Sequence, residues 1–260
     1  MEQFEFISLN ERCRGRIDRV EGEHVPVVVM ATGGSSRGSL SDTWTRFPVF
    51  LRSAGLTSVV FDFAGQGTSD GDRRVLTLRK GVQNLVDALR TITGWSWVSP
   101  NRIALLGSSY GGNVVLDYLA SAPEVAVCGA SLKSPCIDLR ESYLQELGAE
   151  GMRAWEETGY SEAAGLSWQV IAEADKSDLR ERLHRISVPL LITHGVPDES
   201  VPIAQSRTVR DHVPGVVDLL EMNGVNHHYS SRDDWDRMAT VHAAWLAQLF
   251  RRQAEIDTPQ

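Results

Sequence analysis

Short apolar runs alternate with longer segments of helical periodicity along this chain, and this alternation constrains its fold more than any other feature. The apolar runs predict strands, which cover residues 27–32, 56–63, 102–107, 126–132, 188–193 and 216–222. Near-continuous apolar strands are typical of a parallel sheet that is buried on both faces. An opening hairpin is expected before them, because residues 4–9 alternate apolar and polar side chains and residues 14–20 can pair with them.

Helical segments fill the gaps between the predicted strands. Five apolar residues mark one face of the first helix: Leu78, Val82, Leu85, Leu89 and Ile92. Further helices are predicted over residues 113–120, over residues 202–209 and from Ser231 onward. Since strand and helix alternate, we expect an α/β fold, with a mostly parallel central sheet flanked by helices in a single domain of residues 1–260.

Residues 137–185 interrupt the alternation. They contain no convincing strand pattern but several short helical patterns, with aromatic residues at Tyr143, Trp155, Tyr160 and Trp168. A structureless loop of this length is uncommon in a compact domain. We therefore expect a small helical cap inserted over the ends of the strands, and helices packed at the side of the sheet are the alternative.

Composition and charge exclude several classes of partner. The 260 residues carry a formal net charge of −8, and no stretch gathers Lys and Arg with interleaved aromatic residues, so nucleic acid should be repelled. No apolar run is long enough for a membrane span and the first residues lack a signal-peptide pattern, so a cytoplasmic protein is expected. Three cysteines lack metal-ligand spacing and are expected to be buried thiols: Cys13, Cys128 and Cys136.

Residues 107–111, Gly-Ser-Ser-Tyr-Gly, form a Gly-x-Ser-x-Gly motif between a predicted strand and a predicted helix. A nucleophilic serine at the apex of a sharp strand-to-helix turn needs such glycines, because a side chain on either side would clash. The helix that follows directs its first N–H groups toward an anion that develops beside the serine. We therefore expect Ser109 to be a nucleophile.

A serine hydroxyl needs a base, and the base needs an acid that orients it. In this arrangement the acid precedes the histidine, and each follows a late strand. Asp198 lies just after the strand over residues 188–193, and we expect it to be the acid. A simple turn formed with Pro197 is the alternative, and the neighbouring Glu199 is better suited to cap a helix.

The candidate bases follow the last predicted strand. His227 and His228 are adjacent, so only one of them should face Ser109, and the distance from the strand end favours His227. His194 lies beside the loop of the aspartate and is expected to be packed or bonded within a turn. The remaining histidines are expected to be solvated on turns or helix surfaces: His24, His184, His212 and His242.

An acyl-transfer site also needs backbone N–H donors for the oxygen that becomes negative. One donor should be Tyr110, directly after the nucleophile. The other should come from the glycine loop at residues 32–35, where the backbone can approach a ligand closely. Gly34 is the first choice and Ser35 the alternative.

Four motifs in this order resemble those of the α/β-hydrolase superfamily, over about residues 25–250. Beside the serine motif, residues 62–71 are similar to its Asp-x-x-Gly-His-Gly-x-Ser-Asp-Gly loop, residues 195–202 to its Gly-x-x-Asp-x-x-Val-Pro acid loop, and residues 224–227 to its Gly-x-x-His. The branch that the chain resembles contains monoacylglycerol-lipase-like, feruloyl-esterase-like and serine-aminopeptidase-like enzymes. The resemblance implies a triad of Ser109, Asp198 and His227.

The chain departs from this pattern at two positions. Thr32 stands where the superfamily usually has the histidine of His-Gly, and Gln66 stands where it has the histidine of Gly-His-Gly. Neither position belongs to the triad, but both lie near the oxyanion loop, so the hydrogen bonding of that loop should differ.

The expected function is that of a serine hydrolase that cleaves a carboxylic ester or thioester of a small apolar or aryl acyl substrate through an acyl-enzyme. No metal or organic cofactor is implied, the expected partner is the small acyl substrate, and a homodimer is left open. An acyltransferase or cyclase and an aminopeptidase are alternatives, and a non-catalytic ligand-binding protein is a more distant one.

Overall fold

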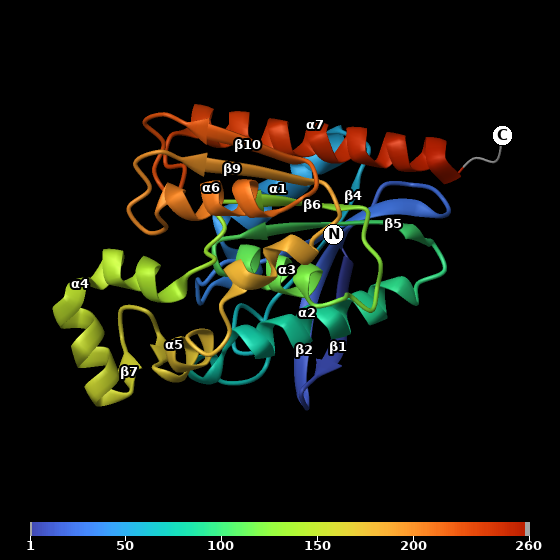
Figure 1. Ribbon diagram of the computed structural model, residues 1–260. Coiled ribbons are helices and arrows are strands. Elements are labelled where there is room, and N and C mark those ends of the chain that lie inside the picture. The colour runs from blue at the N-terminus through green and yellow to red at the C-terminus, as the bar shows by residue number, and fades with distance from the viewer. Residues whose placement is uncertain (1, 258–260) are drawn as a thin grey trace.

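The computed structural model describes residues 2–257, and its centre is an eight-stranded sheet (Figure 1). The strands are β1 (Glu2–Ser8), β2 (Glu11–Asp18), β3 (Val25–Ala31), β4 (Thr57–Phe61), β5 (Val98–Ser108), β6 (Gly129–Lys133), β9 (Leu190–Gly195) and β10 (Val217–Met222). Their order is β1-β2-β4-β3-β5-β6-β9-β10, in which β2 pairs antiparallel with β1 and β4 and every other pairing is parallel. The predicted mostly parallel sheet is confirmed, with the opening hairpin as its antiparallel edge.

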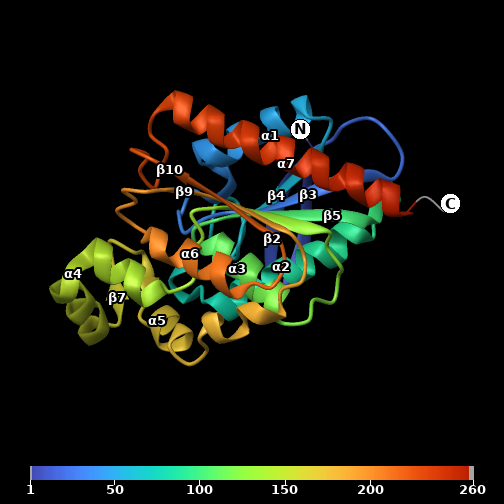
Figure 2. The ribbon, with the colours of Figure 1, turned by 45° about the horizontal axis from the view of Figure 1, so that its top comes forward.

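Helices cover both faces of this sheet (Figures 1 and 2). α1 (Asp42–Ser53) and α7 (Arg232–Asp257) cover one face, whereas α2 (Leu78–Thr93), α3 (Tyr110–Ala120) and α6 (Ile203–His212) cover the other. The sequence patterns did not single out α1, which contains Pro48. That proline lies near the middle of the helix, where it has no backbone N–H to donate to the preceding turn, so its presence in the sequence favours a break there.

Each central strand contributes side chains to two separate cores. In β3, Val27 and Val29 pack into one apolar cluster, while Val28 and Met30 pack into the other on the opposite face. Successive side chains of a strand point to opposite faces, so a strand that is covered on both sides is apolar at most positions. This explains why the strand runs in the sequence are continuous rather than alternating.

We call residues 137–185 the cap segment. Most of it lies beyond the ends of β5, β6 and β9 at the left of Figure 1, whereas residues 179–185 pack against α3 and α6. They form α4 (Leu139–Thr158), β7 (Tyr160–Ser161), β8 (Leu166–Ser167), α5 (Gln169–Ala174) and the 3-10 helix η3 (Leu179–Arg185). α4 is kinked at Gly148, whose φ is 67°. The small β7–β8 hairpin was not expected from the sequence, because strands of two residues are too short to leave an alternating pattern.

An aromatic cluster holds the cap segment together. Trp155 is 1% exposed, and its ring lies 5.0 Å from Tyr143 and 5.5 Å from Trp168 in edge-on contacts. Its indole N–H donates a 3.0 Å hydrogen bond to the carbonyl of Leu166, so the helix and the hairpin are joined through one buried side chain.

Two expectations for single residues were wrong. His242, which the sequence placed on a solvated helix surface, is fully buried between α7 and the sheet. Cys128 is only partly buried, whereas Cys13 and Cys136 are buried as expected. Within residues 2–257, no helix is both long and apolar enough to cross a lipid bilayer.

Candidate active site

Ser109 sits in the turn between β5 and α3, with a φ of 53° and a ψ of −116°. Such a conformation is strained for a residue with a side chain, and strain of this kind gathers at functional sites. The flanking glycines allow the turn: a Cβ on Gly107 would lie 2.7 Å from the carbonyl oxygen of Gly111, and one on Gly111 would collide with the carbonyl of Thr32. The Ser109 N–H donates to the carbonyl of Lys133 at 3.0 Å, which anchors the turn to β6.

Asp198 lies in the loop after β9 and is buried. Its Oδ1 accepts hydrogen bonds from the N–H groups of Ser200 (2.9 Å) and Val201 (2.7 Å). Its Oδ2 lies 2.7 Å from Nδ1 of His227. Because a carboxylate only accepts hydrogen bonds, Nδ1 carries the proton, and Nε2 of the neutral imidazole is left to accept one.

His194 makes a second contact with the same carboxylate. Its Nε2 lies 3.2 Å from Oδ2 of Asp198, and its Nδ1 lies 2.7 Å from the hydroxyl of Ser206. Burial by itself would raise the pKa of the Asp198 carboxyl, but the hydrogen bonds from His194 and His227 hold that pKa well below its usual range. His194 is bonded within its turn as expected, and its contact with the aspartate is a feature that sequence reasoning missed.

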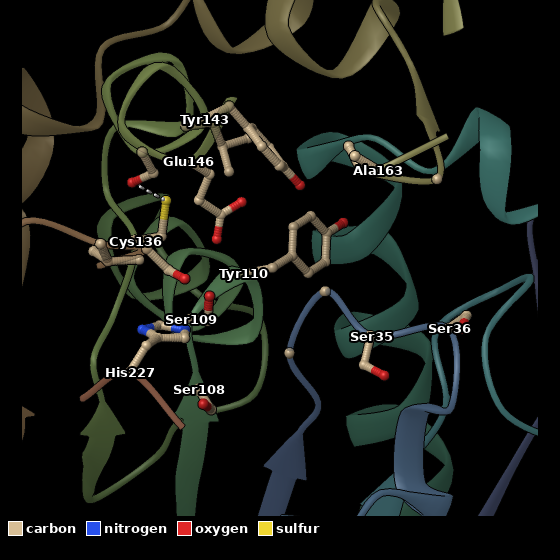
Figure 3. A pocket seen from close by; sticks show the side chains of 18 of the residues that line it. Ser35, Ser36, Ser108, Ser109, Tyr110, Cys136, Tyr143, Glu146, Ala163 and His227 are labelled. Atoms are coloured by element: carbon tan, nitrogen blue, oxygen red, sulfur yellow. Dashed lines mark hydrogen bonds between the residues drawn. The ribbon is translucent and has the colours of Figure 1, made fainter. Parts of the chain in front are cut away.

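His227, and not His228, is the histidine bonded to Asp198. His227 is buried, whereas His228 is exposed and stands edge-on to it, with ring centroids 5.5 Å apart. Figure 3 shows the imidazole of His227 beside the hydroxyl of Ser109, and both side chains line one pocket. Burial lowers the pKa of His227, the bond to Asp198 opposes this, and the charge of Lys133 adds to the lowering. The imidazole is therefore neutral at neutral pH, as a general base has to be.

Lys133 is the residue at this site that sequence reasoning missed. It ends β6 and is 3% exposed, and its ammonium donates a 2.7 Å hydrogen bond to the carbonyl of His227. The same ammonium lies 4.5 Å from the ring centre of Tyr229. Burial lowers the pKa of Lys133 to about 8, although Asp198 opposes the shift. A charged residue directly after a buried apolar strand was the available signal, because a lysine is rarely buried without a specific partner.

Gly34 and Tyr110 lie close together beside Ser109. A Cβ built on Gly34 would lie 3.9 Å from Cβ of Tyr110, and one built on Gly33 would lie 3.8 Å from Cβ of Ser109. The glycine loop thus runs along the start of α3. Figure 3 shows the side chain of Ser35 directed away from Ser109.

The pocket around Ser109 has a volume of about 810 Å³, which is in the range of sites for small organic ligands. The cap segment supplies much of its wall, including Tyr143, Glu146 and Tyr160. In Figure 3 the carboxylate of Glu146 extends from α4 into the space above Ser109.

Arg73 joins the cap segment to the glycine loop across this pocket. It lies in the short 3-10 helix η2 (Arg73–Val75) and donates to the carbonyls of Ala164 (2.8 Å) and Gly165 (2.6 Å) in the β7–β8 turn. It also donates to the carbonyl of Gly34. One guanidinium therefore ties the cap segment to the backbone that lies beside Ser109.

Comparison with known proteins agrees with this architecture. Residues 46–253 match the model of the prolyl oligopeptidase family. The human mitochondrial palmitoyl-protein thioesterase ABHD10 is 27% identical over 198 residues, which are 71% of this chain and 61% of that protein. Acylamino-acid-releasing enzyme 2 of Oryza sativa subsp. japonica is 25% identical over 197 residues, 71% of this chain and 24% of that protein. The match thus spans less than two thirds of the length of either relative.

Solved structures give the same picture of the fold. Alpha/beta hydrolase domain-containing protein 10 from mouse has a TM-score of 0.77 at 19% identity, covering 96% of this chain and 100% of that one. Est1E from Butyrivibrio proteoclasticus, solved with bound ferulic acid, has a TM-score of 0.76 at 18% identity, covering 97% and 99%. The resemblance to α/β-hydrolases seen in the sequence motifs is confirmed. Because the family model matches most of the chain, this protein belongs to the prolyl oligopeptidase family, within the α/β-hydrolase superfamily of enzymes.

Proposed function

We propose that this protein is a serine hydrolase that cleaves a carboxylic ester or thioester, with Ser109 as nucleophile, His227 as general base and Asp198 as the orienting acid. The observation that carries the proposal is the buried 2.7 Å contact between Nδ1 of His227 and Oδ2 of Asp198, next to a serine held in a strained turn. An imidazole fixed in this tautomer presents Nε2 to the serine hydroxyl.

The reaction proceeds by acyl transfer to water. Nε2 of His227 takes the hydroxyl proton as Oγ of Ser109 attacks the substrate carbonyl, and Asp198 stabilises the imidazolium that forms. The N–H groups of Gly34 and Tyr110 stabilise the oxyanion, and the imidazolium protonates the leaving group. Water, activated by the same histidine, then releases the acyl group from the serine.

The expected acyl group is apolar or aromatic. Tyr143 and Tyr160 from the cap segment line the pocket together with Trp44, so an acyl chain would meet aromatic side chains. The names of two relatives point the same way, since one is a palmitoyl-protein thioesterase and the other a protein that binds ferulic acid. The cytoplasmic location stays a prediction, and the human relative is named as mitochondrial.

Hydrolysis of aminoacyl substrates is the second candidate function. Glu146 extends its carboxylate into the pocket above Ser109, where it could receive the ammonium of an amino-acyl group (Figure 3). The sequence offered several glutamates in the cap segment without a way to choose among them, and this placement favours Glu146.

Labelling with a fluorophosphonate tests the proposed function. The wild type should be labelled, and Ser109→Ala should not be, because only an activated serine attacks the phosphorus. Rates on an aryl ester, an acyl thioester and an aminoacyl amide, compared for the wild type and Glu146→Gln, separate the two candidates. If Glu146→Gln loses at least tenfold on the aminoacyl amide alone, the second candidate is favoured. A wild type that stays unlabelled would contradict both.

A further inference from the structure

We propose that Gln66, held in place by Thr32, is a positioning residue that orients the peptide between Gly33 and Gly34, whose N–H is a donor of the oxyanion hole. The inference rests on the proposed function, because it concerns the same transition state. It assigns a joint role to the two positions at which this chain departs from the superfamily pattern.

A chain of two hydrogen bonds connects these residues. The hydroxyl of Thr32 donates to Oε1 of Gln66 at 3.1 Å, and Nε2 of Gln66 donates to the carbonyl of Gly33 at 3.2 Å. Thr32 is fully buried and Gln66 is 1% exposed, so water has little access to the bond between these two side chains, while the bond to the half-buried Gly33 is partly shielded. The direction of the chain is determined by chemistry: a carbonyl only accepts, so the amide nitrogen must face Gly33, and its oxygen must then accept from Thr32.

This arrangement controls an N–H group through the carbonyl of the same peptide. The carbonyl of Gly33 and the N–H of Gly34 belong to one planar unit and point in opposite directions. A donor that holds the carbonyl on one side therefore aims the N–H to the other. Glycines on both sides of this peptide allow it to rotate more freely than other residues would. The hydrogen bond from Gln66 to the Gly33 carbonyl therefore has a large effect on the direction of the Gly34 N–H.

Hydrogen bonds fix the backbone around Gln66 and so fix the starting point of its side chain. The Gln66 N–H donates to the carbonyl of Phe63, and the N–H of Gly67 donates to the carbonyl of Ser36, both at 2.9 Å. The turn after β4 is thus bonded to the end of the glycine loop itself. A buried carboxylate strengthens the junction, since Asp62 accepts from the hydroxyl of Ser39 and from the N–H of Thr68.

A glutamine and a threonine hold the peptide without a titratable proton. Neither side chain changes its charge near neutral pH, whereas an imidazole at either position would do so at mildly acidic pH. The hold that Thr32 and Gln66 exert on the Gly33–Gly34 peptide therefore does not depend on pH. The acid limb of its pH–rate profile should report the base alone, and a Gln66 variant should lower the rate equally at every pH.

Steady-state kinetics of Gln66→Met on an aryl ester tests the inference. We expect kcat to fall about 30-fold while KM changes less than about threefold, because an oxyanion donor acts in the transition state and not in substrate binding. The affinity for an aryl boronic acid, which forms a tetrahedral adduct on the serine, should fall by a similar factor. Gln66→His, which keeps a donor at this position, should recover most of the rate.

Thr32 should act only through Gln66, and a double-mutant cycle measures this. Thr32→Val alone should lower kcat about fivefold, Thr32→Ser should be near wild type, and Thr32→Val combined with Gln66→Met should be no slower than Gln66→Met alone. Gln83→Met on α2, where the amide donates to Asp87 in the same helix, is the matched control and should leave kcat and KM unchanged.

Two results would overturn the inference. One is a Gln66→Met variant in which KM rises by as much as kcat falls while the boronate affinity is unchanged. The other is full additivity of the effects of Thr32→Val and Gln66→Met on kcat. Either would mean that the pair only supports the loop. Thermal unfolding of each variant identifies those that fail to fold. If Gln66→Met and Thr32→Val fail to fold, the kinetics of Gln66→His and Thr32→Ser, which keep a donor at each position, still test the inference. Fluorophosphonate labelling of the wild type is independent of these outcomes, so its failure would contradict the proposed function instead.

Discussion

Among single residues, Lys133 has the most unusual environment for its chemistry. Its carbonyl accepts from the N–H of Ser109, and its ammonium donates to the carbonyl of His227, so one residue touches the backbone of both proposed catalytic partners. A buried ammonium is costly, and such groups are retained mainly where they have a function. Its charge also lowers the pKa of His227, after the larger effect of burial.

Lys133→Met should shift the acid limb of the pH–rate profile upward. The base is active when neutral, so kcat/KM falls as the pH drops through the pKa of His227, which lies below its ordinary value of 6.5. Removing the nearby positive charge raises that pKa, and we expect the midpoint of the acid limb to move to higher pH. The other groups that act on the imidazole are unchanged: Asp198 and His228. The measurement is kcat/KM from pH 4.5 to 8.

The stability of the same variant provides its control. Because burial lowers the pKa of Lys133, the folded protein carries a disfavoured charge at neutral pH. Replacing that charge with an apolar side chain of similar length should leave the thermal midpoint equal to or above that of the wild type. A variant that unfolds earlier and keeps the original pH midpoint would limit Lys133 to a structural role.

At the level of elements, the site lies where three connections meet. The β5–α3 turn presents Ser109, the loop after β3 presents Gly34, and the β7–β8 turn of the cap segment is joined to the Gly34 loop through Arg73. The guanidinium is the one side chain described above that contacts both the cap segment and the glycine loop. We therefore expect the position of the cap segment to depend on it.

Arg73→Met should weaken substrate binding and loosen the cap segment. Loss of the charge-assisted bonds to Ala164 and Gly165 should raise KM about tenfold, which corresponds to about 1.4 kcal/mol. This is less than the bonds themselves contribute, because they act on the substrate only through the position of the cap segment. Limited proteolysis should cut within residues 137–185 faster than in the wild type. Arg210→Met, which removes an exposed pair with Asp211 on α6, is the control and should change neither quantity. An unchanged cleavage pattern in Arg73→Met would contradict the role.

Across the whole molecule, a buried polar network joins α7 to the sheet and to the His227 loop. Nδ1 of His242 contacts the hydroxyl of Ser131 on β6, and its Nε2 lies 2.8 Å from the hydroxyl of Thr193 on β9. The hydroxyl of Tyr229 lies 3.4 Å from the same Thr193 hydroxyl. Burial, with a smaller effect of Lys133, lowers the pKa of His242 to about 3, so the imidazole is neutral in the folded protein.

His242 should make the protein sensitive to acid. The unfolded chain binds a proton at this histidine near pH 6.5 and the folded one only near pH 3, so the stability is complete above pH 6.5 and is lost progressively below it. The expected contribution is about 1.4 kcal/mol per pH unit within that window. Urea unfolding of His242→Leu should give lower stability at pH 7, by about 1–3 kcal/mol, with a weaker dependence on pH. His212→Leu, at an exposed position, should keep the slope of the wild type.

The strands, most helices and the serine turn were predictable from the sequence because each depends on local information. Continuous apolar runs identify doubly covered strands, and the glycines at 107 and 111 mark the serine turn in the sequence. Gly107 is needed within the turn itself, whereas Gly111 is also needed because Thr32 of the neighbouring loop approaches it closely. The order of the acid and histidine motifs was sufficient to propose Asp198 and His227. Their contact is then a consequence of parallel strands that end at the same edge of the sheet.

Other features depend on which side chains meet, and only the tertiary structure decided these. The sequence gives no distance between Thr32 and Gln66, between Lys133 and the carbonyl of His227, or between Glu146 and the pocket. His242 has the same helical setting as a solvated histidine until the packing of α7 buries it. A sequence specifies local conformation through sterics and periodicity, but a hydrogen bond or a buried charge between distant residues exists only when the fold has brought them together.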